Sequence, residues 1–526
     1  MGTLLNTADS FDGYTLFAPV SSTRTYLIDN CGQVVNEWQS NDRPALSAYL
    51  LEDGSLLRTQ QANNAGFNSG GSGGKIQRFS WDGTLVWDFD LSNQNECQHH
   101  DVEYLPNGNI LMIAWEKRTS AEAIAAGRNT DFVPPTLWPE KIVEIAPTGL
   151  TTGDVVWEWR AWDHLIQDFD PAKANYGVVA DHPELIDINY PESATSDWLH
   201  ANSIDHNAEL DQIVISLRSI DEIWVIDHST TTAEAASHTG GNSGKGGDLL
   251  YRWGNPQTYG RGDDQARVFY GQHDARWITD GPDAGKLMIF NNGQNRPSGL
   301  SYSSVDVIAP PVDAFGQYTA PVAGEPFLPA GLDWTYEGTP NTSFFAVRVS
   351  GAERLPNNNT LICNGPAGRF FEINDQKEVV WEYQSPIAAA LPVEQGTPAG
   401  TGHNVFRCTR YAPDFAAFEG RDLTPGDVIE LNSTATCELF TTPTSIADPD
   451  ANAVQLVSDH GNNTISIRNI RERCHVEVFD LFGRVVAQTV ASTDVHTLST
   501  AGWPAGIYLF RVGNADRVTS KKAFVN

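Results

Sequence analysis

Hydrophobic residues in the first 440 positions occur in short runs, and pairs such as Asn-Gly, Asp-Gly and Gly-Gly separate these runs. The runs are rich in Val, Ile, Trp and Tyr, which fit the pleated surface of a sheet. Short runs between turn-forming pairs are typical of β-strands joined by hairpins. No helical heptad pattern accompanies them. We therefore predict an all-β protein in which helix is scarce.

A unit of a hairpin and two further strands repeats along residues 1–440. Its last strand is the easiest to recognise, because it ends like Val-Val-Trp-Glu-Trp. Copies of this strand lie at Gln33–Trp38, Leu85–Phe89, Asp154–Trp159, Asp248–Trp253, Asp333–Tyr336 and Val379–Tyr383. Four-stranded units of about 40 to 70 residues suit a β-propeller, in which sheets stack radially around a channel. The repeat predicts a six-bladed β-propeller over residues 1–440.

The two ends of this region each carry part of a blade. Thr25–Trp38 has only the outer strands, whereas His403–Asn432 has strands without outer partners. We expect residues 25–38 and 403–432 to form one sheet that closes the ring. The long insertion Ala161–Trp198 is expected to form a lid or rim that includes His164 and His182.

Beyond residue 440 the pattern changes to short alternating strands. We predict a linker at residues 441–463 and a small Ig-like β-sandwich at residues 464–526. The phrases Val-Phe-Asp-Leu-Phe-Gly-Arg, Gly-Ile-Tyr-Leu-Phe-Arg-Val and Lys-Lys-Ala-Phe-Val follow one another there. This wording closely resembles the C-terminal sorting domain of type IX secretion cargo. The resemblance implies a partner in the type IX secretion machinery and a secreted or outer-membrane-surface bacterial protein.

Charge narrows the set of partners. The chain has 34 Lys and Arg against 66 Asp and Glu, a net charge of −32. This charge repels nucleic acid, so polynucleotide binding is not expected. The sequence has no run of about 18 apolar residues, so we predict no transmembrane segment. Residues 1–10 lack the pattern of a signal peptide. The six cysteines form no metal-binding spacing; an even number allows disulfides but identifies no pairing.

Three histidines share one position in similar hairpins. His100, His200 and His273 each stand seven residues before the Asn or Asp that opens the turn. The first strand of a propeller blade lines the central channel, so residues at one register cluster near its axis. His99 precedes His100, but only His100 has the neighbouring Asp in the register of His273. We therefore expect His100, His200 and His273 to form one site.

The hairpin after His200 supplies further candidates. The midpoint of residues 200 and 218 falls in the turn Asn207–Asp211, so antiparallel pairing places Arg218 across from His200. Asn202 lies two residues after His200 and is expected on the same face of the strand. A guanidinium, an amide and imidazoles together suit a tetrahedral oxyanion such as sulfate or phosphate.

These motifs resemble those of the bacterial arylsulfate sulfotransferases, which use no nucleotide sulfate donor. The similarity covers residues 13–432 and includes Thr25-Tyr-Leu-Ile-Asp-Asn-Cys, the His-x-Asn at 200–202, Arg218 and the Gln-His-Asp at 272–274. It implies a small aromatic sulfate ester as donor, a phenol as acceptor, and no cofactor. It also implies a ping-pong transfer of the sulfuryl group through a sulfohistidine.

The resemblance implies a role for each residue. His273 is the nucleophile, His100 is the general acid and base for the phenol oxygen, and Arg218 holds sulfuryl oxygens together with His200 and Asn202. His403 is a further central histidine that matches the register less well. The candidates are catalytic His273, His100, His200 and Arg218 and substrate-binding Asn202 and His403, with no metal ligand expected.

Two other functions fit parts of the pattern. Inward histidines at a propeller axis can hold Fe(II) in an oxygenase, although Arg218 beside them disfavours a dication. A secreted propeller can also bind a glycan or protein without catalysis, because a fold alone does not establish chemistry.

Overall fold

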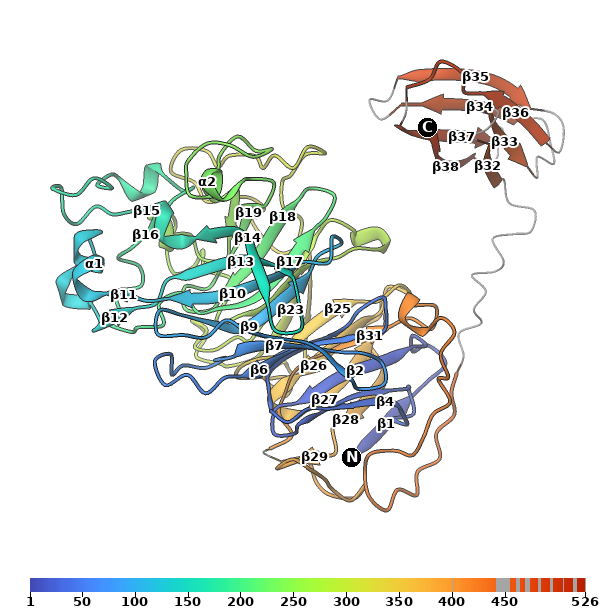
Figure 1. The fold of residues 1–526 in the computed structure, drawn as a ribbon, viewed down its shortest axis with the longest axis horizontal. Coiled ribbons are helices and arrows are strands. Elements are labelled where there is room, and N and C mark those ends of the chain that lie inside the picture. The colour runs from blue at the N-terminus through green and yellow to red at the C-terminus, as the bar shows by residue number, and fades with distance from the viewer. Residues whose placement is uncertain are drawn as a thin grey trace. The chain divides into compact units, whose positions relative to one another are not determined.

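The computed structural model describes residues 1–400 and 402–440, and parts of the remainder: 455–459, 464–468, 474–480, 484–491, 495–504, 506–513 and 518–525. The chain divides into two compact units, Met1–Phe440 and Thr441–Asn526. Strands dominate both units, and helices are few and short (Figure 1). The expected all-β class is therefore confirmed. None of the helices in the described part of the chain has the length and apolar character needed to cross a bilayer.

Within the described residues, antiparallel sheets of four or five strands number six in the first unit. The first two sheets, with strands in spatial order, are β31 (Val405–Tyr411), β2 (Tyr14–Pro19), β3 (Arg24–Ile28) and β4 (Val34–Gln39), and β5 (Pro44–Leu50), β6 (Leu56–Gln61), β7 (Gly74–Phe79) and β8 (Leu85–Asp90). The next two are β9 (Glu96–Tyr104), β10 (Ile110–Glu116), β13 (Glu140–Pro147) and β14 (Gly153–Arg160), and β17 (Ala201–Asn207), β18 (Gln212–Leu217), β19 (Glu222–Asp227) and β20 (Tyr251–Trp253). The last two are β21 (His273–Trp277), β22 (Leu287–Asn291), β23 (Ser304–Ile308) and β24 (Trp334–Glu337), and β25 (Gly351–Arg354), β26 (Thr360–Asn364), β27 (Arg369–Ile373), β28 (Val379–Gln384) and β1 (Gly2–Asn6).

The first strands of these sheets contact one another in cyclic order. β5 contacts β9, and β17, β21, β25 and β31 follow in turn until β31 contacts β5 again. Carboxylates join neighbouring strands of the cycle: Asp205 accepts a hydrogen bond from the Trp277 N–H (2.7 Å), and Asp274 accepts one from the Ala352 N–H (2.9 Å). These two bonds link β17 to β21 and β21 to β25.

The recurring outer strand is observed as β4, β8, β14, β20, β24 and β28. Its tryptophan has a repeated task, since the buried indole N–H donates to a backbone carbonyl of the next sheet in five of these cases among the described residues. The pairs are Trp38 to Ser80, Trp87 to Thr152, Trp159 to Gly247, Trp253 to Pro329 and Trp381 to Asn30. The sequence repeat therefore encodes both a strand and its attachment to the following sheet.

The N-terminal residues enter two sheets. β2, β3 and β4 lie beside β31, so the N-terminal contribution begins at Tyr14, earlier than the expected Thr25, and the C-terminal contribution is one named strand. β1 adds a fifth strand next to β28. A disulfide joins Cys31 to Cys437 across 406 positions of sequence. Both ends of the first unit are therefore tied to the sheets that they complete.

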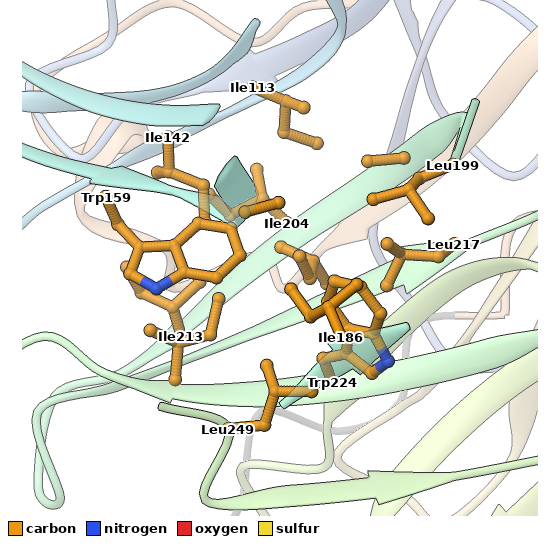
Figure 2. Packing of buried hydrophobic residues seen from close by; sticks show 14 of the residues in the cluster. Ile113, Ile142, Trp159, Ile186, Leu199, Ile204, Ile213, Leu217, Trp224 and Leu249 are labelled. Atoms are coloured by element: carbon orange, nitrogen blue, oxygen red, sulfur yellow. The ribbon is translucent and has the colours of Figure 1, made fainter. Parts of the chain in front are cut away.

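A large buried core lies between the β9–β14 sheet and the β17–β20 sheet. Figure 2 shows Ile142 and Trp159 of the first sheet with Ile204 and Ile213 of the second. Ile186 of the insertion Ala161–Trp198 belongs to the same cluster, so the insertion is packed into the core as well as covering it. Each fully buried aliphatic side chain contributes about 1.5–3 kcal/mol relative to exposure.

The remaining elements of the first unit are short. They are α1 (Ser120–Ala125), α2 (Thr232–Ala235), β11 (Arg118–Thr119), β12 (Thr136–Leu137), β15 (Leu165–Ile166), β16 (Ile186–Asp187), β29 (Ile387–Ala388), β30 (Leu391–Pro392), and the 3₁₀ turns η1 (Thr130–Phe132), η2 (Ala161–His164), η3 (Val179–Asp181), η4 (Pro256–Tyr259), η5 (Gly281–Asp283), η6 (Asn341–Ser343), η7 (Gly365–Ala367) and η8 (Ala416–Phe418).

The second unit contains two antiparallel sheets that share one hydrophobic core, which includes Ile465, Val476 and Phe510. The strands are β32 (Gln455–Asp459), β33 (Thr464–Arg468) and β36 (Val495–Ser499) in one sheet, and β35 (Val485–Ala491), β34 (Cys474–Phe479), β37 (Gly506–Gly513) and β38 (Val518–Val525) in the other. The expected linker 441–463 lies outside the described residues except for 455–459, which form β32.

Candidate active site

The three histidines in shared register lie on or directly before the first strands of three consecutive sheets: His200 directly before β17, His273 at the start of β21, and His100 within β9. Each of these strands, β9, β17 and β21, has an irregular register with its neighbour at this point. His100 and His200 have positive φ values of 51° and 55°, and Asp274, next to His273, has 55°. Bulges redirect side chains and are frequent beside active sites. The bulges therefore turn the three histidines out of the normal strand alternation.

His100 and His200 lie side by side, with ring centroids 4.7 Å apart. His200 Nδ1 is 2.5 Å from Asp197 Oδ2. Asp197 also accepts hydrogen bonds from the Ser69 hydroxyl (2.5 Å) and the Trp115 indole (3.1 Å). Burial opposes ionisation of Asp197, but the adjacent His200 and the hydrogen bond from Ser69 hold its pKa below the usual value. A charged carboxylate therefore orients the His200 ring.

A hydrogen bond with His99 determines which nitrogen of His100 carries the proton. Its Nε2 donates to Glu140 Oε2 (2.8 Å), because a carboxylate only accepts, and its ring stacks on Trp115. His99 Nδ1 is then the acceptor in the 2.9 Å contact with His100 Nδ1. This chain leaves the lone pair of His100 on Nε2. The two adjacent histidines thus differ in role: His99 links Glu140 to His100, and His100, which shares the register of the other histidines, lies beside His200.

Burial, followed by the nearby His200, lowers the pKa of His100 well below its usual value. His100 is 3% exposed. The imidazole is therefore neutral at physiological pH, which is the form that can accept a proton.

His273 is held as one tautomer. The Asn292 amide donates to the carbonyls of Ala346 (2.8 Å) and Val349 (3.0 Å), so its Oδ1 faces His273 Nδ1 at 2.7 Å and accepts from it. The lone pair of His273 consequently lies on Nε2, which accepts a 3.2 Å hydrogen bond from the Val349 N–H. Burial and the Arg218 guanidinium lower the pKa of His273 to about 3. A neutral nucleophilic nitrogen is therefore available over a wide pH range.

Arg218 faces His200 across the hairpin, as expected. Ala201 pairs with Leu217, and the Arg218 N–H donates to the His200 carbonyl (3.1 Å). Its guanidinium makes no ion pair or side-chain hydrogen bond with any residue in 1–400 or 402–440, although it lowers the pKa of His273. Asp221 on the same cavity wall interacts with its charge without forming an ion pair, so the guanidinium keeps its donors for an anionic ligand.

A cavity of about 330 Å³ adjoins this group, and Asp197, Arg218, Arg267 and Tyr270 contribute to its wall. The three histidines are not part of this wall, whereas Arg218 is.

A glycine-rich loop covers the histidine pair. The Gly71 carbonyl accepts from the His100 N–H (2.9 Å), and Gly71 has φ +80°. A Cβ atom at this position would lie 2.0 Å from His100 Cε1, whereas one at Gly70 would lie 3.6 Å from His200 Cε1. Only glycine allows this approach of backbone to the His100 ring.

Asn202 lies apart from the cavity. The register of β17 against β18 shifts between Ala201 and Ser203, and this bulge breaks the alternation that would place Asn202 beside His200. Asn202 is fully buried, and its amide donates to the Gln272 carbonyl (2.7 Å). It therefore positions the start of β21, the strand of His273.

His403 is also buried, at 2% exposure, just before β31. It lies against Gly368, and its Nδ1 has no hydrogen-bond partner among the described residues. No hydrogen bond or ring contact joins it to the other three histidines in the described part of the chain. The structure therefore groups His100, His200, His273 and Arg218, and leaves His403 outside this group.

Several supporting residues have no counterpart among the sequence candidates. They are Asp197, Glu140, Asn292 and Gly71, together with Arg407, which bridges Asp101 (2.8 Å) and Asp274 (3.3 Å). Asp197 carried one signal, its position three residues before His200. The others come from distant segments, and no spacing in the sequence connects them to the histidines.

The buried imidazoles of His100 and His273 and the guanidinium of Arg218 form an arrangement suited to an anionic group in an all-β protein. The Arylsulfotransferase (ASST) family matches residues 7–390. The chain therefore belongs to this family of sulfotransferases. The Secretion system C-terminal sorting domain matches residues 460–526, as the resemblance of the tail implied.

Other comparisons add little. No curated protein matches the chain. Solved structures include a Bacteroides caccae protein of unknown function (11% identity, 76% of this chain and 98% of that chain, TM-score 0.41). PorZ of Porphyromonas gingivalis (10%, 97% and 50%, 0.29) and a streptogramin B lyase (13%, 72% and 81%, 0.34) are also similar. These likenesses are too distant to bear on activity.

Proposed function

We propose that this chain transfers a sulfuryl group from an aryl sulfate ester to a phenolic acceptor by a ping-pong mechanism, with His273 as the residue that carries the group. The observation that supports this most is the fixed tautomer of His273: Asn292 accepts from Nδ1 at 2.7 Å, so Nε2 holds the lone pair. Nearby, Arg218 has no side-chain partner in the described first unit. A neutral imidazole nitrogen is a competent nucleophile for group transfer.

The scaffold we propose is a six-bladed β-propeller, followed by an Ig-like β-sandwich. The cyclic contacts of the six first strands and the tryptophan attachments between successive sheets support the propeller. In this fold the three histidines lie at one mouth of the central channel.

The first step forms a bond between His273 Nε2 and sulfur and breaks the bond between sulfur and the aryl oxygen. The negative charge of the bound ester favours protonation of His100, which then gives its proton to the departing phenolate. Arg218 and His200 stabilise the charge on the sulfuryl oxygens. The weak hydrogen bond from the Val349 N–H to Nε2 (3.2 Å) is displaced as sulfur approaches.

The second step reverses these changes with a different phenol. The acceptor oxygen attacks sulfur, the bond from sulfur to Nε2 breaks, and His100 Nε2 takes the phenol proton. The support from Glu140 through His99 keeps Nε2 as the accepting atom of His100. Neither step consumes a cofactor. The bond to sulfur forms in the first step and breaks in the second at the same atom, His273 Nε2.

The test is release of 4-nitrophenol from 4-nitrophenyl sulfate in the presence of a phenol. We expect His273→Ala to abolish turnover, whereas His182→Ala, at an exposed histidine paired with Glu184, should retain it. With donor but no acceptor, the peptide containing His273 should gain about 80 Da, the mass of a sulfuryl group. Wild-type turnover in His273→Ala, or the added mass on a serine or tyrosine, would refute this assignment.

The sorting domain points to a secreted or outer-membrane-surface protein. We propose that the type IX machinery recognises residues 464–526 and that the sulfuryl transfer takes place outside the cell. Small phenols and aryl sulfates reach such a site without transport into the cytoplasm.

A further inference from the structure

A second group of histidines lies outside the proposed active site. His164 belongs to η2 at the start of the insertion, and His238 and Asp248 belong to the loop that follows α2 (Figure 1). His164 Nδ1 is 2.8 Å from Asp248 Oδ1, and His238 Nδ1 is 2.7 Å from the same oxygen. Three potential ligand atoms therefore lie within 4.8 Å of one another.

The hydrogen bonding of His164 identifies which nitrogen carries a proton. Its Nε2 is 2.8 Å from the Ala235 carbonyl, which can only accept, so Nε2 carries the hydrogen. The Nδ1 lone pair of the neutral ring is then directed at the carboxylate of Asp248, which is also an acceptor. Two acceptors at hydrogen-bond distance need a cation between them or a proton on Nδ1. Metal-ligating histidines commonly donate their other N–H to a backbone carbonyl in this way.

From this arrangement we propose that His164 Nδ1, His238 Nδ1 and Asp248 Oδ1 bind one transition-metal dication of the Zn²⁺ class. Two imidazoles and one carboxylate are suitable zinc ligands, and a water molecule would complete a tetrahedron. Metal–ligand bonds of about 2.0–2.1 Å at tetrahedral angles require ligand separations of about 3.3 Å. Each nitrogen lies about half an ångström closer than this to Asp248 Oδ1, so both the Asp248 carboxylate and the 61% exposed side chain of His238 must shift to admit the ion.

Burial and neighbouring contacts hold the other two ligands, His164 and Asp248, in position. His164 is completely buried, contrary to its expected place at the rim, and its ring stacks on Trp159. Trp159 also donates to the Gly247 carbonyl, directly before Asp248. The net charge of −32 favours a dication at such a site.

The ion would join the start of the insertion to the loop after α2. The far end of the same insertion carries Asp197, which orients His200. The site is therefore structural in character, and it shares no residue with the sulfuryl-transfer group. Its existence does not depend on the proposed reaction.

The test uses the full chain after treatment with a chelator. Titration with ZnCl₂ in a calorimeter should show one bound equivalent, and CoCl₂ should give the visible absorption of tetrahedral cobalt. His238→Ala and Asp248→Asn should each weaken zinc binding at least 100-fold. His238→Ala removes an exposed side chain, so it should fold normally even if changes at buried His164 do not.

Asp211→Asn is the matched comparison, because Asp211 contacts His206 (3.0 Å) and His228 (2.7 Å) in the other group of the described residues whose side chains could hold an ion. It should leave zinc binding unchanged, and zinc should raise the thermal midpoint by several degrees in wild type but not in His238→Ala. Absence of stoichiometric binding, wild-type affinity in His238→Ala, or loss of binding in Asp211→Asn would each overturn the proposal.

Discussion

The depressed pKa of His273 predicts that the first half-reaction tolerates acid unusually well. A histidine with the ordinary pKa of 6.5 is only about 3% neutral at pH 5, whereas one with a pKa of about 3 is about 99% neutral. The difference in available nucleophile is roughly 30-fold. Because the nucleophile must be neutral, its contribution should decline only as the pH falls through about 3. We therefore expect kcat/KM for the donor not to fall between pH 7 and about pH 4.5, since protonation of His100, which the first step requires, can only raise it over this range.

The assay is the initial rate of 4-nitrophenol release at low donor concentration. Samples are stopped in alkali so that the absorbance of the product does not depend on the reaction pH. Under these conditions the profile reports ionisations of the free enzyme. The protein's fold should be checked at each pH by circular dichroism, so that acid unfolding is not read as titration of His273.

Arg218→Met supplies the decisive comparison. Removing the guanidinium takes away a positive charge that lowers the pKa of His273, so the acid midpoint should move to higher pH, in addition to any loss of rate. Arg267→Met is the matched control, because Arg267 lines the same cavity but pairs with Asp221 (3.3 Å). The acid midpoint of kcat/KM in Arg267→Met should equal that of the wild type. A wild-type midpoint near 6.5, or equal midpoints in wild type and Arg218→Met, would contradict the reasoning.

Other changes test the support of the histidines. Asp197→Asn should lower kcat/KM about 10- to 100-fold, because a charge-assisted hydrogen bond to His200 of about 1.5–3 kcal/mol is lost; unchanged kcat/KM would argue against an orienting role. Gly71→Ala should reduce activity at least tenfold, because its methyl group would overlap the His100 ring. Gly83→Ala has a similar φ of +82° but open space around it, so it should retain activity. Equal losses in the two glycine variants would indicate that backbone strain, rather than contact with His100, is responsible.

The strands and the histidine group could be read from the sequence because both depend on local periodicity. Alternation and turn residues determine where a strand begins, and hairpin arithmetic places Arg218 opposite His200, as the pairing of Ala201 with Leu217 shows. The expected position of Asn202 rested instead on regular strand alternation, which the register shift between Ala201 and Ser203 interrupts. A bulge adds a residue without leaving an evident signal in the sequence.

The supporting contacts could not be predicted because they join segments that meet only after folding. Glu140 reaches His99 from another strand of the sheet, and Asn292 reaches His273 from the end of a hairpin. The pairing of Cys31 with Cys437 spans 406 positions, and an even number of cysteines gives no information about such a pair. The full burial of His164 likewise follows from packing against Trp159 rather than from its neighbours in sequence.

The position of β31 has a consequence for how the chain is made. Residues 14–39 form three strands early in synthesis, but their innermost partner comes from residues 405–411. Until that stretch has left the ribosome, Tyr14–Pro19 has an unpaired edge, which can pair wrongly with other strands. Contacts of such long sequence separation also form slowly. The nascent protein is thus aggregation-prone until its last inner strand arrives, and a stop after residue 400 should yield an insoluble product.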